Sequence, residues 1–536
     1  MGEHCTRRDV LKMAGLAGLA ALTGNAAPAA APPTRPNFLI IVADDMGFSD
    51  AGCYGGEIET PNLDRLAGGG VRFTHGYSTA RCWPTRSCIT TGYYAQQVRM
   101  DPPRGRLPQW ARLLPHYLKP EGYRCYHSGK WHVMGAPKAV ADGGFDRSYK
   151  LDDHDRHFYP RQHSEDDQPL PPVKPDSGYY TATAMADHAI RCLRDHAEHH
   201  ADKPFFSYLA FTVPHFPLHA LPEDIARYRD RYAEGWDAVR ERRWKRLREM
   251  GIVHCALAPL DTDLAPRYFR KEFLDSLGPG EVNRAVPWNT LTGEQKRFQA
   301  AKMAVHAAMV DRMDREIGRV LDQVRAMGAL DNTIVFFISD NGADATILVR
   351  GDRHDPAAPP GSGASYLCIG PGWASASNAP FRRHKIWVHE GGIAAPWIVH
   401  WPRGIRARGE LRHDLCHVID FVPTLLDLAG VRPSETWHGA QPPPLPGRSL
   451  VPAFARDGVV RRELLFFHHE GNRAIRMGDW KLVSAREDKD AWELFDLSAD
   501  RCEQVNLIVQ QPDRARAMEA KWRELEAEFR RQADPP

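Results

Sequence analysis

Three long apolar runs, each followed at once by polar residues, constrain the fold of this chain more than any other feature. The runs are 37–43, 205–211 and 333–338, and they consist mainly of branched and aromatic hydrophobic residues. Such runs are typical of strands that are buried on both faces of a parallel sheet. Segments with helical periodicity, 301–327 and 420–430, are interspersed with them. The sequence therefore predicts an α/β protein with a mostly parallel sheet.

Oxygen donors stand directly after two of these runs. Asp44 and Asp45 follow the first run, and Asp340 and Asn341 follow the third. Adjacent carboxylates at the end of a buried strand are costly unless something neutralises them, and ligands bind at this end of α/β sheets. Because all four side chains offer oxygen, they predict a Ca²⁺ or Mg²⁺ site rather than a zinc site. A solvated turn is the alternative for the Asp pair.

The segment 82–92 places a nucleophile beside a cation. Pro84 is predicted to begin a helix, where its missing N–H costs nothing, so that Cys82 lies at a helix N-terminus that favours anions. Arg86 follows one turn later on the same face. This arrangement suits attack on a tetrahedral oxyanion ester. Taken alone, the segment also fits a buried structural cysteine before a helix.

Two further places carry groups suited to oxyanion chemistry. A strand that ends at Gly129 would present Lys130 and His132 on one side, where an ammonium and an imidazole could hold an oxyanion and relay a proton. His215 follows the second apolar run, in a loop whose shape is fixed by prolines. A lone histidine is more often structural, so His215 is the weaker candidate on this evidence.

The composition sets the protein class. The chain has 536 residues, of which 43% are hydrophobic and 26% charged, and its net charge is +2. These values indicate a soluble globular protein with room for a large and a smaller domain, and they give no support to nucleic-acid binding. The ten cysteines show no zinc spacing, and their positions define no disulfide pairing. Basic residues between 240 and 248 are interpreted as a solvated helix face.

An export leader is predicted at the N-terminus. Arg7 and Arg8 precede a short apolar run, 13–22, which is followed by an Ala/Pro-rich stretch. This pattern is typical of a twin-arginine signal peptide, predicted here over 1–31, with a disordered basic tail as the alternative. We therefore expect the twin-arginine export machinery as a partner and a periplasmic or secreted location. No later segment reaches membrane-spanning length, so stable membrane insertion is not expected.

Several motifs occur together in one order along the chain. Cys82-Trp83-Pro84-Thr85-Arg86 resembles the first signature of the type I, formylglycine-dependent sulfatases, with Thr85 where that family usually has Ser. Gly129-Lys130-Trp131-His132 resembles the second signature, and Lys385 stands five residues before Glu390-Gly391-Gly392 as in that family. The resemblance covers about 36–510. It is closest to bacterial arylsulfatases through 56–61, 370–374 and an insertion near 227–250.

The resemblance implies a fold and a domain plan. The expected fold is an alkaline-phosphatase-like sandwich, with a large mixed, mostly parallel sheet between helices and a small C-terminal α+β subdomain that holds an antiparallel sheet. The expected boundaries are 36–440 for the catalytic domain, with an insertion at 220–300, and 447–536 for the C-terminal subdomain. The long segment 345–379 is expected to be a lid-like loop.

The resemblance also implies an activity, sulfuric ester hydrolysis of a sulfated small molecule or glycan. A maturation enzyme would oxidise Cys82 to formylglycine, whose hydrate is the nucleophile. Ca²⁺, with Mg²⁺ as the alternative, would be held by Asp44, Asp45, Asp340 and Asn341. Lys130, Lys385 and Arg86 would neutralise charge on the sulfate, His215 and Lys385 would protonate the leaving group, and His132 would accept a proton.

Other functions use related sites. A phosphonate monoester or phosphodiester hydrolase can use the same formylglycine and metal, whereas a metal-only phosphatase would want Ser or Thr in place of Cys82. An exported protein that binds sulfated sugars without turnover is the non-enzymatic alternative. The natural leaving group is not defined by the motifs. The histidines that were weighed as leaving-group contacts or surface residues are His154, His157, His219 and His384.

Overall fold

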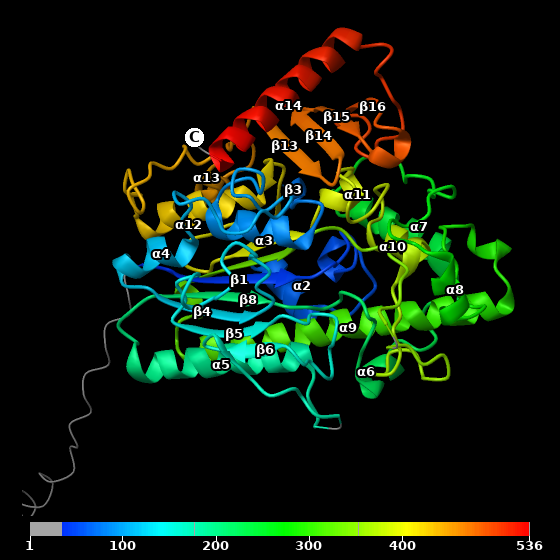
Figure 1. The fold of residues 1–536 in the computed structure, drawn as a ribbon, viewed down its shortest axis with the longest axis horizontal. Coiled ribbons are helices and arrows are strands. Elements are labelled where there is room, and N and C mark those ends of the chain that lie inside the picture. Colours follow the sequence, from blue (N-terminus) through cyan, green and yellow to red (C-terminus); the bar gives the residue numbers. More distant parts are fainter. Residues whose placement is uncertain (1–34, 176, 352, 535–536) are drawn as a thin grey trace, which may run out of the picture.

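The computed structural model describes residues 35–175, 177–351 and 353–534, so the predicted leader over 1–31 lies outside the described residues. A ten-stranded sheet in the order β11-β2-β10-β9-β1-β8-β4-β5-β6-β7 crosses the centre of the molecule (Figure 1). The run β9-β1-β8-β4-β5 is parallel, whereas β10 is antiparallel to both β9 and β2. The strands are β1 (Asn37–Ala43), β2 (Val71–Phe73), β4 (Arg124–Gly129), β5 (Arg147–Leu151), β6 (His163–Glu165), β7 (Gln168–Pro169), β8 (Phe205–Ala210), β9 (Thr333–Ser339), β10 (Trp397–His400) and β11 (Glu410–Arg412). The predicted mixed, mostly parallel sheet is confirmed.

Strand β1 shows why the apolar runs form the centre of this sheet. Phe38, Ile40 and Val42 join the hydrophobic cluster on one face, and Leu39 and Ile41 join the cluster on the other. All five side chains are completely buried. Burying each such side chain stabilises the fold by roughly 1.5–3 kcal/mol, so a strand without polar positions is driven to the middle of the sheet.

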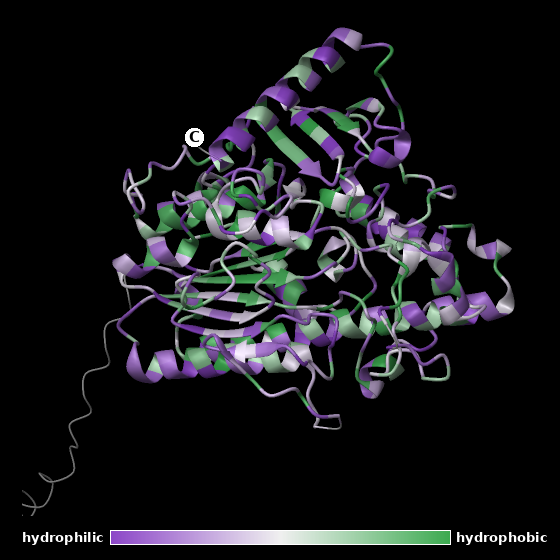
Figure 2. Cartoon of the chain, viewed as in Figure 1, coloured by the Kyte–Doolittle hydropathy of each residue, from purple (hydrophilic) through white to green (hydrophobic). Residues whose placement is uncertain are grey.

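Helices cover both faces of the sheet. The long helices α5 and α9 pack against each other on one face, while α3, α4 and α12 lie on the other (Figure 1). Figure 2 shows the hydrophobic strands between helices whose outer sides are hydrophilic. Helix α9 begins eight residues before its predicted start, because Thr292 and Gln295 form a capping box there. The helices before the C-terminal part are α2 (Pro61–Gly68), α3 (Cys82–Thr91), α4 (Leu114–Leu118), α5 (Thr181–His199), α6 (Pro222–Ala226), α7 (Gly235–Glu249), α8 (Lys271–Leu277), α9 (Gly293–Ala326), α10 (Gly370–Ser377), α11 (Glu390–Ile393), α12 (Phe421–Ala429) and α13 (Val451–Ala455).

A small antiparallel sheet with one helix across it forms the C-terminal part (Figure 1). Met518, Trp522 and Phe529 are the buried stripe of α14, as their helical spacing predicts. The four strands are paired in chain order, β13 with β14, β14 with β15 and β15 with β16, and all pairs are antiparallel. The elements are β13 (Leu464–His469), β14 (Asn472–Met477), β15 (Trp480–Ser484), β16 (Trp492–Asp496) and α14 (Pro512–Ala533), and a separate pair consists of β3 (Gly76–Tyr77) and β12 (Cys416–His417).

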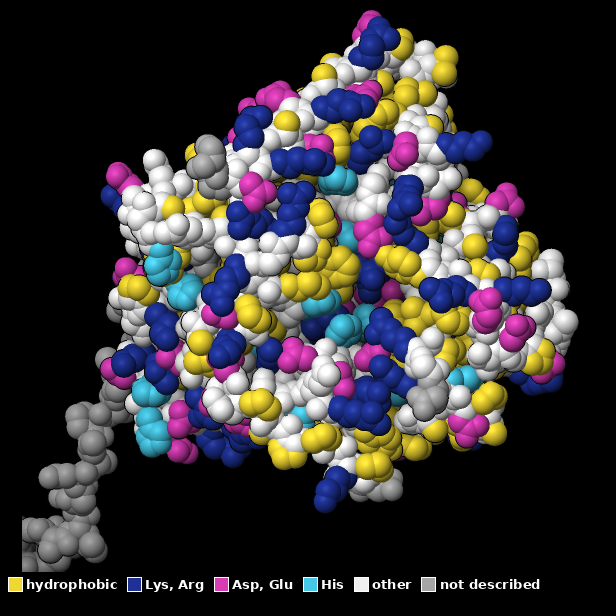
Figure 3. All heavy atoms as spheres, viewed as in Figure 1, with side chains coloured by type: hydrophobic (Ala, Val, Ile, Leu, Met, Phe, Trp, Pro, Cys, Tyr) yellow, Lys and Arg dark blue, Asp and Glu magenta, His cyan; other side chains and the backbone are white. Residues whose placement is uncertain are grey.

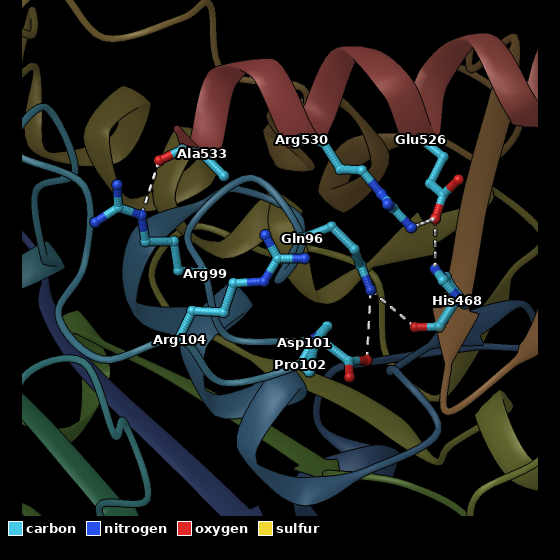
Figure 4. A pocket seen from close by; sticks show the side chains of 9 residues that line it. All are labelled: Gln96, Arg99, Asp101, Pro102, Arg104, His468, Glu526, Arg530 and Ala533. Carbon is cyan, nitrogen blue, oxygen red and sulfur yellow. Dashed lines mark hydrogen bonds and ion pairs between the residues drawn. The ribbon is translucent and has the colours of Figure 1, made fainter. Parts of the chain in front are cut away.

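Helix α14 also docks on the catalytic part through the loop near residues 96–104 (Figure 4). Arg99 Nε donates to the Ala533 carbonyl oxygen at 2.9 Å, and Gln96 Nε2 donates to the His468 carbonyl oxygen at 2.8 Å. Glu526 Oε1 accepts from Arg530 Nη2 at 2.6 Å. The cavity between them is about 30 Å³, room for little more than a water molecule, so this seam is structural.

Two expectations for the middle of the chain were wrong. The basic side of α7 is not a solvated face, because Arg243 is completely buried against Asp50 and Glu57. The segment 345–379 is not a loop throughout, because 370–377 form the buried helix α10. Trp373 of α10 packs at 5.6 Å between ring centroids against Trp236 of α7, which draws both segments into the core. Within the described ranges, no helix is long and apolar enough to span a membrane.

Candidate active site

The carboxyl ends of β1 and β9 bring the four predicted oxygen donors together. Ala43 pairs with Ser339 in the sheet, so Asp44 and Asp45 emerge beside Asp340 and Asn341. The Asp45 N–H donates to Asp340 Oδ1 at 3.2 Å, and Asn341 Nδ2 donates to Asp45 Oδ1 at 2.7 Å. All four side chains are buried, and Asp45 has a φ of 67°, a strained conformation of the kind found at functional sites.

Each carboxylate of this group has its own cation. Lys130 Nζ lies 2.6 Å from Asp44 Oδ2, and Lys385 Nζ lies 2.7 Å from Asp45 Oδ1. Arg86 donates to Asp340 Oδ2 through Nε at 3.1 Å and Nη2 at 2.9 Å. These pairs bring together five segments that are far apart in the sequence.

Burial opposes ionisation of these carboxylates, and the neighbouring cations offset this effect to different degrees. Burial and the charge of Asp44 together raise the pKa of Asp340 to about 7, despite the guanidinium of Arg86. Burial also raises the pKa of Asp45, and Lys385 offsets this only in part. The pKa of Asp44 is lowered, because Lys130 and Arg86 together outweigh its burial. A cation bound between these carboxylates would favour their ionised forms.

These residues fit a hard divalent cation. Asp44 Oδ1 and Asn341 Oδ1 are buried oxygens without a hydrogen-bond partner among the described residues, and such atoms are costly unless a ligand satisfies them. Ligand atoms of Asp44, Asp340 and Cys82 lie within 4.8 Å of one another, as do those of Asp44, Asp45 and His215. The donors are mainly carboxylate and amide oxygens, the set that Ca²⁺ and Mg²⁺ prefer.

Cys82 lies at the first position of α3, directly beside this group. The helix begins at Cys82 and not at Pro84 as predicted, so Pro84 is the third helical residue, where its N–H would still have no intrahelical partner. Thr85 Oγ1 donates to the Asp340 carbonyl oxygen at 2.6 Å, which fixes the helix to the end of β9. Burial raises the pKa of the Cys82 thiol, but the charges of Lys130 and Lys385 bring the net pKa below its ordinary value.

Three histidines form a row along the site. The His132 and His154 rings are 5.3 Å apart, and the His154 and His215 rings are 5.0 Å apart. His215 Nε2 lies 3.6 Å from Asp45 Oδ2, whereas its Nδ1 faces the Phe216 carbonyl oxygen at 2.5 Å. Burial, followed by the neighbouring lysine charges, holds the pKa values of His132 and His215 well below the ordinary range. Both rings are therefore neutral before any proton transfer.

The other histidines that the sequence raised have different places. His157 Nε2 faces the carbonyl oxygen of His215 at 3.0 Å and supports the row from behind. His219 Nε2 faces the Ser365 carbonyl oxygen at 2.7 Å. The His384 ring contacts Trp387 at 6.0 Å between centroids. Among these four histidines, only His154 lies in the row itself.

Sequence reasoning missed two charged residues at the site. Asp344 Oδ2 lies 3.2 Å from Lys385 Nζ, although no motif includes Asp344. The Arg81 guanidinium lies 5.0 Å from the Trp83 ring centroid and 5.7 Å from that of Tyr268, and its Nε and Nη1 have no hydrogen-bond partner among the described residues. The position of Arg81 directly before Cys82, the predicted nucleophile, was the available signal. Figure 3 shows a hollow in this face of the molecule with histidine, Lys and Arg side chains around it.

The comparison with protein families decides the class of this site. The family model described as Sulfatase matches residues 36–431. The chain belongs to the sulfatase family. A second model, N-sulphoglucosamine sulphohydrolase, C-terminal, matches residues 382–531 of this sulfatase. The predicted family and the predicted enzyme class, sulfuric ester hydrolase, are thereby confirmed.

Relatives of this sulfatase cover most of its length. It is 31% identical to an arylsulfatase of Klebsiella aerogenes over 458 residues, which span 78% of this chain and 92% of the relative. It is 27% identical to an N-acetylglucosamine-6-O-sulfatase of Bacteroides thetaiotaomicron over 523 residues, 88% of this chain and 83% of the relative. The family and the relatives support sulfate ester hydrolysis.

Solved structures share the fold. Ps i-CgsB in complex with k-i-k-neocarrahexaose has a TM-score of 0.65 and 22% identity, with 93% of this chain and 94% of that chain covered. BT4656 in complex with its substrate D-glucosamine-2-N,6-O-disulfate has a TM-score of 0.63 and 20% identity, with 94% and 99% covered. At these identities the likeness concerns the fold alone, and it confirms the sandwich that the motifs implied.

Proposed function

We propose that this sulfatase hydrolyses a sulfate monoester of a sugar or an aryl alcohol, so that ester and water give the free alcohol or phenol, inorganic sulfate and a proton. The observation that carries the proposal is the place of Cys82. It lies at a helix N-terminus, its thiol is within 4.8 Å of ligand atoms of Asp44 and Asp340, and Lys130 and Lys385 lower its pKa. A nucleophile in this setting faces the charge that an anionic ester develops during attack.

Two changes after synthesis complete the site in this proposal: the conversion of Cys82 and the binding of a metal ion. A maturation enzyme converts Cys82 to formylglycine, which supplies a hydrated aldehyde whose hydroxyl is the nucleophile. A Ca²⁺ ion, with Mg²⁺ as the alternative, supplies positive charge toward the sulfate oxygens when bound. Asp44, Asp45, Asp340 and Asn341 would hold that ion, which agrees with the unpartnered oxygens of Asp44 and Asn341.

The basic side chains have separate tasks. The ammonium groups of Lys130 and Lys385 lie beside the metal ligands and would face the sulfate oxygens, whose charge they stabilise. Arg86 has no exposed surface, and its donors bind Asp340 and the Lys130 carbonyl oxygen. We therefore assign Arg86 to positioning these two residues. This differs from the direct sulfate contact that the family resemblance implied.

Proton transfer falls to His132, His215 and Lys385. Because His215 Nδ1 donates to the Phe216 carbonyl oxygen, its Nε2 is the nitrogen that gains and loses a proton. We propose that His215 Nε2 or Lys385 Nζ protonates the departing oxygen of the alcohol. His132 Nδ1 has no partner in the described structure, so this ring can accept the proton released at the nucleophile.

A comparison of ester classes on one preparation tests the proposal. We expect kcat/KM for nitrophenyl sulfate to exceed the value for a phenyl phosphonate monoester and for a phosphodiester. The opposite order would support the alternative function, a phosphonate monoester or phosphodiester hydrolase. Peptide mass spectrometry of the same preparation is expected to show formylglycine at position 82. Full sulfatase activity with an unmodified thiol would overturn the formylglycine assignment and leave the hydrolase assignment intact.

Export and domain organisation complete the proposal. We propose that the segment over 1–31 directs the folded sulfatase through the twin-arginine pathway to the periplasm or medium. We also propose that 220–300 is an insertion in a catalytic domain over 36–440, and that 447–536 is a subdomain. Consistent with an insertion near the site, Tyr268 of this segment packs on Arg81 beside the nucleophile.

A further inference from the structure

A pocket lined by arginines lies beside the histidine row. Its volume is about 330 Å³, within the usual range of ligand pockets. Arg156, Arg161 and Arg353 line it together with the aromatic rings of Phe158, Tyr159 and Tyr366. We call it the arginine pocket. Neither the motifs nor the proposed mechanism uses any of these six residues.

Residues in and next to the arginine pocket connect it to the histidine row. Arg156 follows His154 by two residues, and the His154 ring contacts the rings of both His132 and His215. From the other side, Phe216 stacks on His215 at 4.2 Å between centroids and lies under the Arg350 guanidinium at 5.5 Å. These contacts place the arginine pocket next to the histidine row, although none of the three histidines lines the pocket.

The charges of the arginine pocket are incompletely paired. Asp155 Oδ2 is shared by Arg350 Nη1 and Arg353 Nη1, each at 2.7 Å, and Arg156 Nε lies 3.3 Å from Asp153 Oδ2. Arg161 has no side-chain partner in the part of the chain that the structure describes. Among the described residues, three arginines and one carboxylate, that of Asp155, line the arginine pocket, and Asp155 is shared with Arg350 outside the lining.

The arginines also act on one another. Burial lowers the pKa of Arg156, and the charges of Arg353 and Arg161 lower it further. Like charges that face each other across a pocket destabilise the empty arrangement, and an anion between them relieves the repulsion. Guanidinium groups bind two oxygens of a sulfate or a carboxylate through paired hydrogen bonds.

We infer that the arginine pocket binds a second anionic group of the substrate, and that the substrate class is a polyanionic glycan. The sulfate to be cleaved lies at Cys82, and a second sulfate or a carboxylate on the same or the adjoining sugar enters the arginine pocket. Phe158, Tyr159 and Tyr366 offer apolar faces to the sugar ring between the two anions. This inference rests on the proposed sulfatase function, because it names the substrate of the same site.

Equilibrium binding tests the inference without turnover. In the Cys82→Ala background, we expect a disulfated disaccharide to bind more tightly than its monosulfated counterpart, and Arg161→Gln to weaken only the former, by about tenfold or more. A uronate-containing monosulfated disaccharide distinguishes a carboxylate from a second sulfate as the preferred group. Arg325→Gln, which removes an exposed arginine on α9, is the matched control and is expected to change neither affinity.

Kinetic measurements on protein that retains Cys82 provide the second test of the inference. Arg161→Gln and Arg353→Gln are expected to raise KM for the disulfated or uronate substrate while kcat/KM for nitrophenyl sulfate stays unchanged. Equal affinity for mono- and dianionic disaccharides, or equal loss on all substrates, would overturn the arginine pocket. Absence of any sulfate ester hydrolysis by the wild-type protein would instead overturn the proposed function, and the binding arm would still decide the pocket.

Discussion

Arg86 shows how single residues give this site its shape. Its guanidinium is completely buried and connects the end of β9, through Asp340, to the end of β4, through the Lys130 carbonyl oxygen. A rigid planar fork can reach both acceptors at once, whereas a lysine ammonium cannot. In the proposed site, Arg86 would therefore hold a metal ligand, Asp340, and a sulfate-facing cation, Lys130, in place.

We predict that Arg86→Lys lowers kcat for nitrophenyl sulfate by about a hundredfold, because small displacements of reacting groups cost that much. Arg325→Lys on the surface is the control for the same chemical change. The Tm of both variants shows whether the loss reflects unfolding. Activity of Arg86→Lys within a few-fold of the wild-type value would show that charge alone matters at position 86.

Cys82 and Cys88 lie on one helix, but we assign Cys82 to catalysis and Cys88 to packing. Cys88 is completely buried in an apolar cluster, and burial raises the pKa of its thiol. We predict that Cys82→Ala abolishes turnover and keeps the wild-type Tm. Cys88→Ala is expected to keep turnover and to lose about 1 kcal/mol of stability through the small cavity it leaves. Turnover that survives Cys82→Ala would exclude residue 82 as the nucleophile.

The metal assignment has a readout that is independent of activity. We predict that Ca²⁺ raises the Tm of the inactive Cys82→Ala variant, because a ligand that binds only the folded state stabilises it increasingly, as the logarithm of its free concentration above Kd. Asp340→Asn in the same background is expected to remove most of this shift. A calorimetric scan with and without chelator measures it, and an unchanged Tm at saturating Ca²⁺ would argue against the site.

Helix α7 has a basic composition, but its arginines differ in how deeply they are buried. Arg243 Nη1 lies 2.7 Å from Asp50 Oδ1, and its Nη2 lies 2.8 Å from Glu57 Oε1, all beneath the helix. Its neighbour Arg242 is 40% exposed and reaches Glu234 at the surface. One turn of the same basic helix thus contains a core ion pair and a solvated one.

We predict that Arg243→Ala lowers the free energy of unfolding by about 3–5 kcal/mol, because Asp50 and Glu57 lose a buried partner. Arg242→Ala is the matched control, and an exposed ion pair contributes only about 0–1 kcal/mol. Urea denaturation measures both variants. Equal, small effects would mean that α7 is dispensable to the core and would favour the solvated interpretation after all.

At the scale of the whole molecule, one buried ion network joins the C-terminal sheet to the catalytic sheet. Glu390 accepts from Lys481 Nζ at 3.0 Å and from Arg501 Nε at 3.0 Å, and Tyr77 Oη donates to it at 2.7 Å. Glu390 follows Lys385 by five residues. The network therefore anchors the segment that brings Lys385 to the site.

This network predicts an acid dependence of stability. Burial raises the pKa of Glu390, but Lys481 and Arg501 outweigh it and lower the pKa from 4.5 to about 2. Because the folded-state pKa is the lower one, the stabilisation is complete above pH 4.5 and is lost as the pH falls toward 2. We expect Glu390→Gln to lower Tm at neutral pH and to approach the wild-type Tm in that acid window. A Tm difference that does not change with pH would contradict this assignment.

The sequence by itself determined the sheet and the chemistry along it. Apolar runs fixed β1, β8 and β9 because continuous hydrophobicity has no other stable place than the middle of a covered sheet. The residues directly after those runs then had to meet at one edge, which is how Asp44 and Asp340 could be foreseen as partners. The Cys82, Lys130 and Lys385 motifs added the groups around them.

Only the tertiary structure decided which residues face one another across the chain. Arg243 looked like a surface residue until Asp50 and Glu57 surrounded it, and His154 and Arg81 belong to no periodic pattern. The arginine pocket joins residues near 156–161 with Arg353, segments that almost two hundred positions separate along the chain. Local sequence patterns indicate which side chains are buried. Which side chains contact each other depends on packing between segments that are distant in the sequence, and no local pattern contains this information.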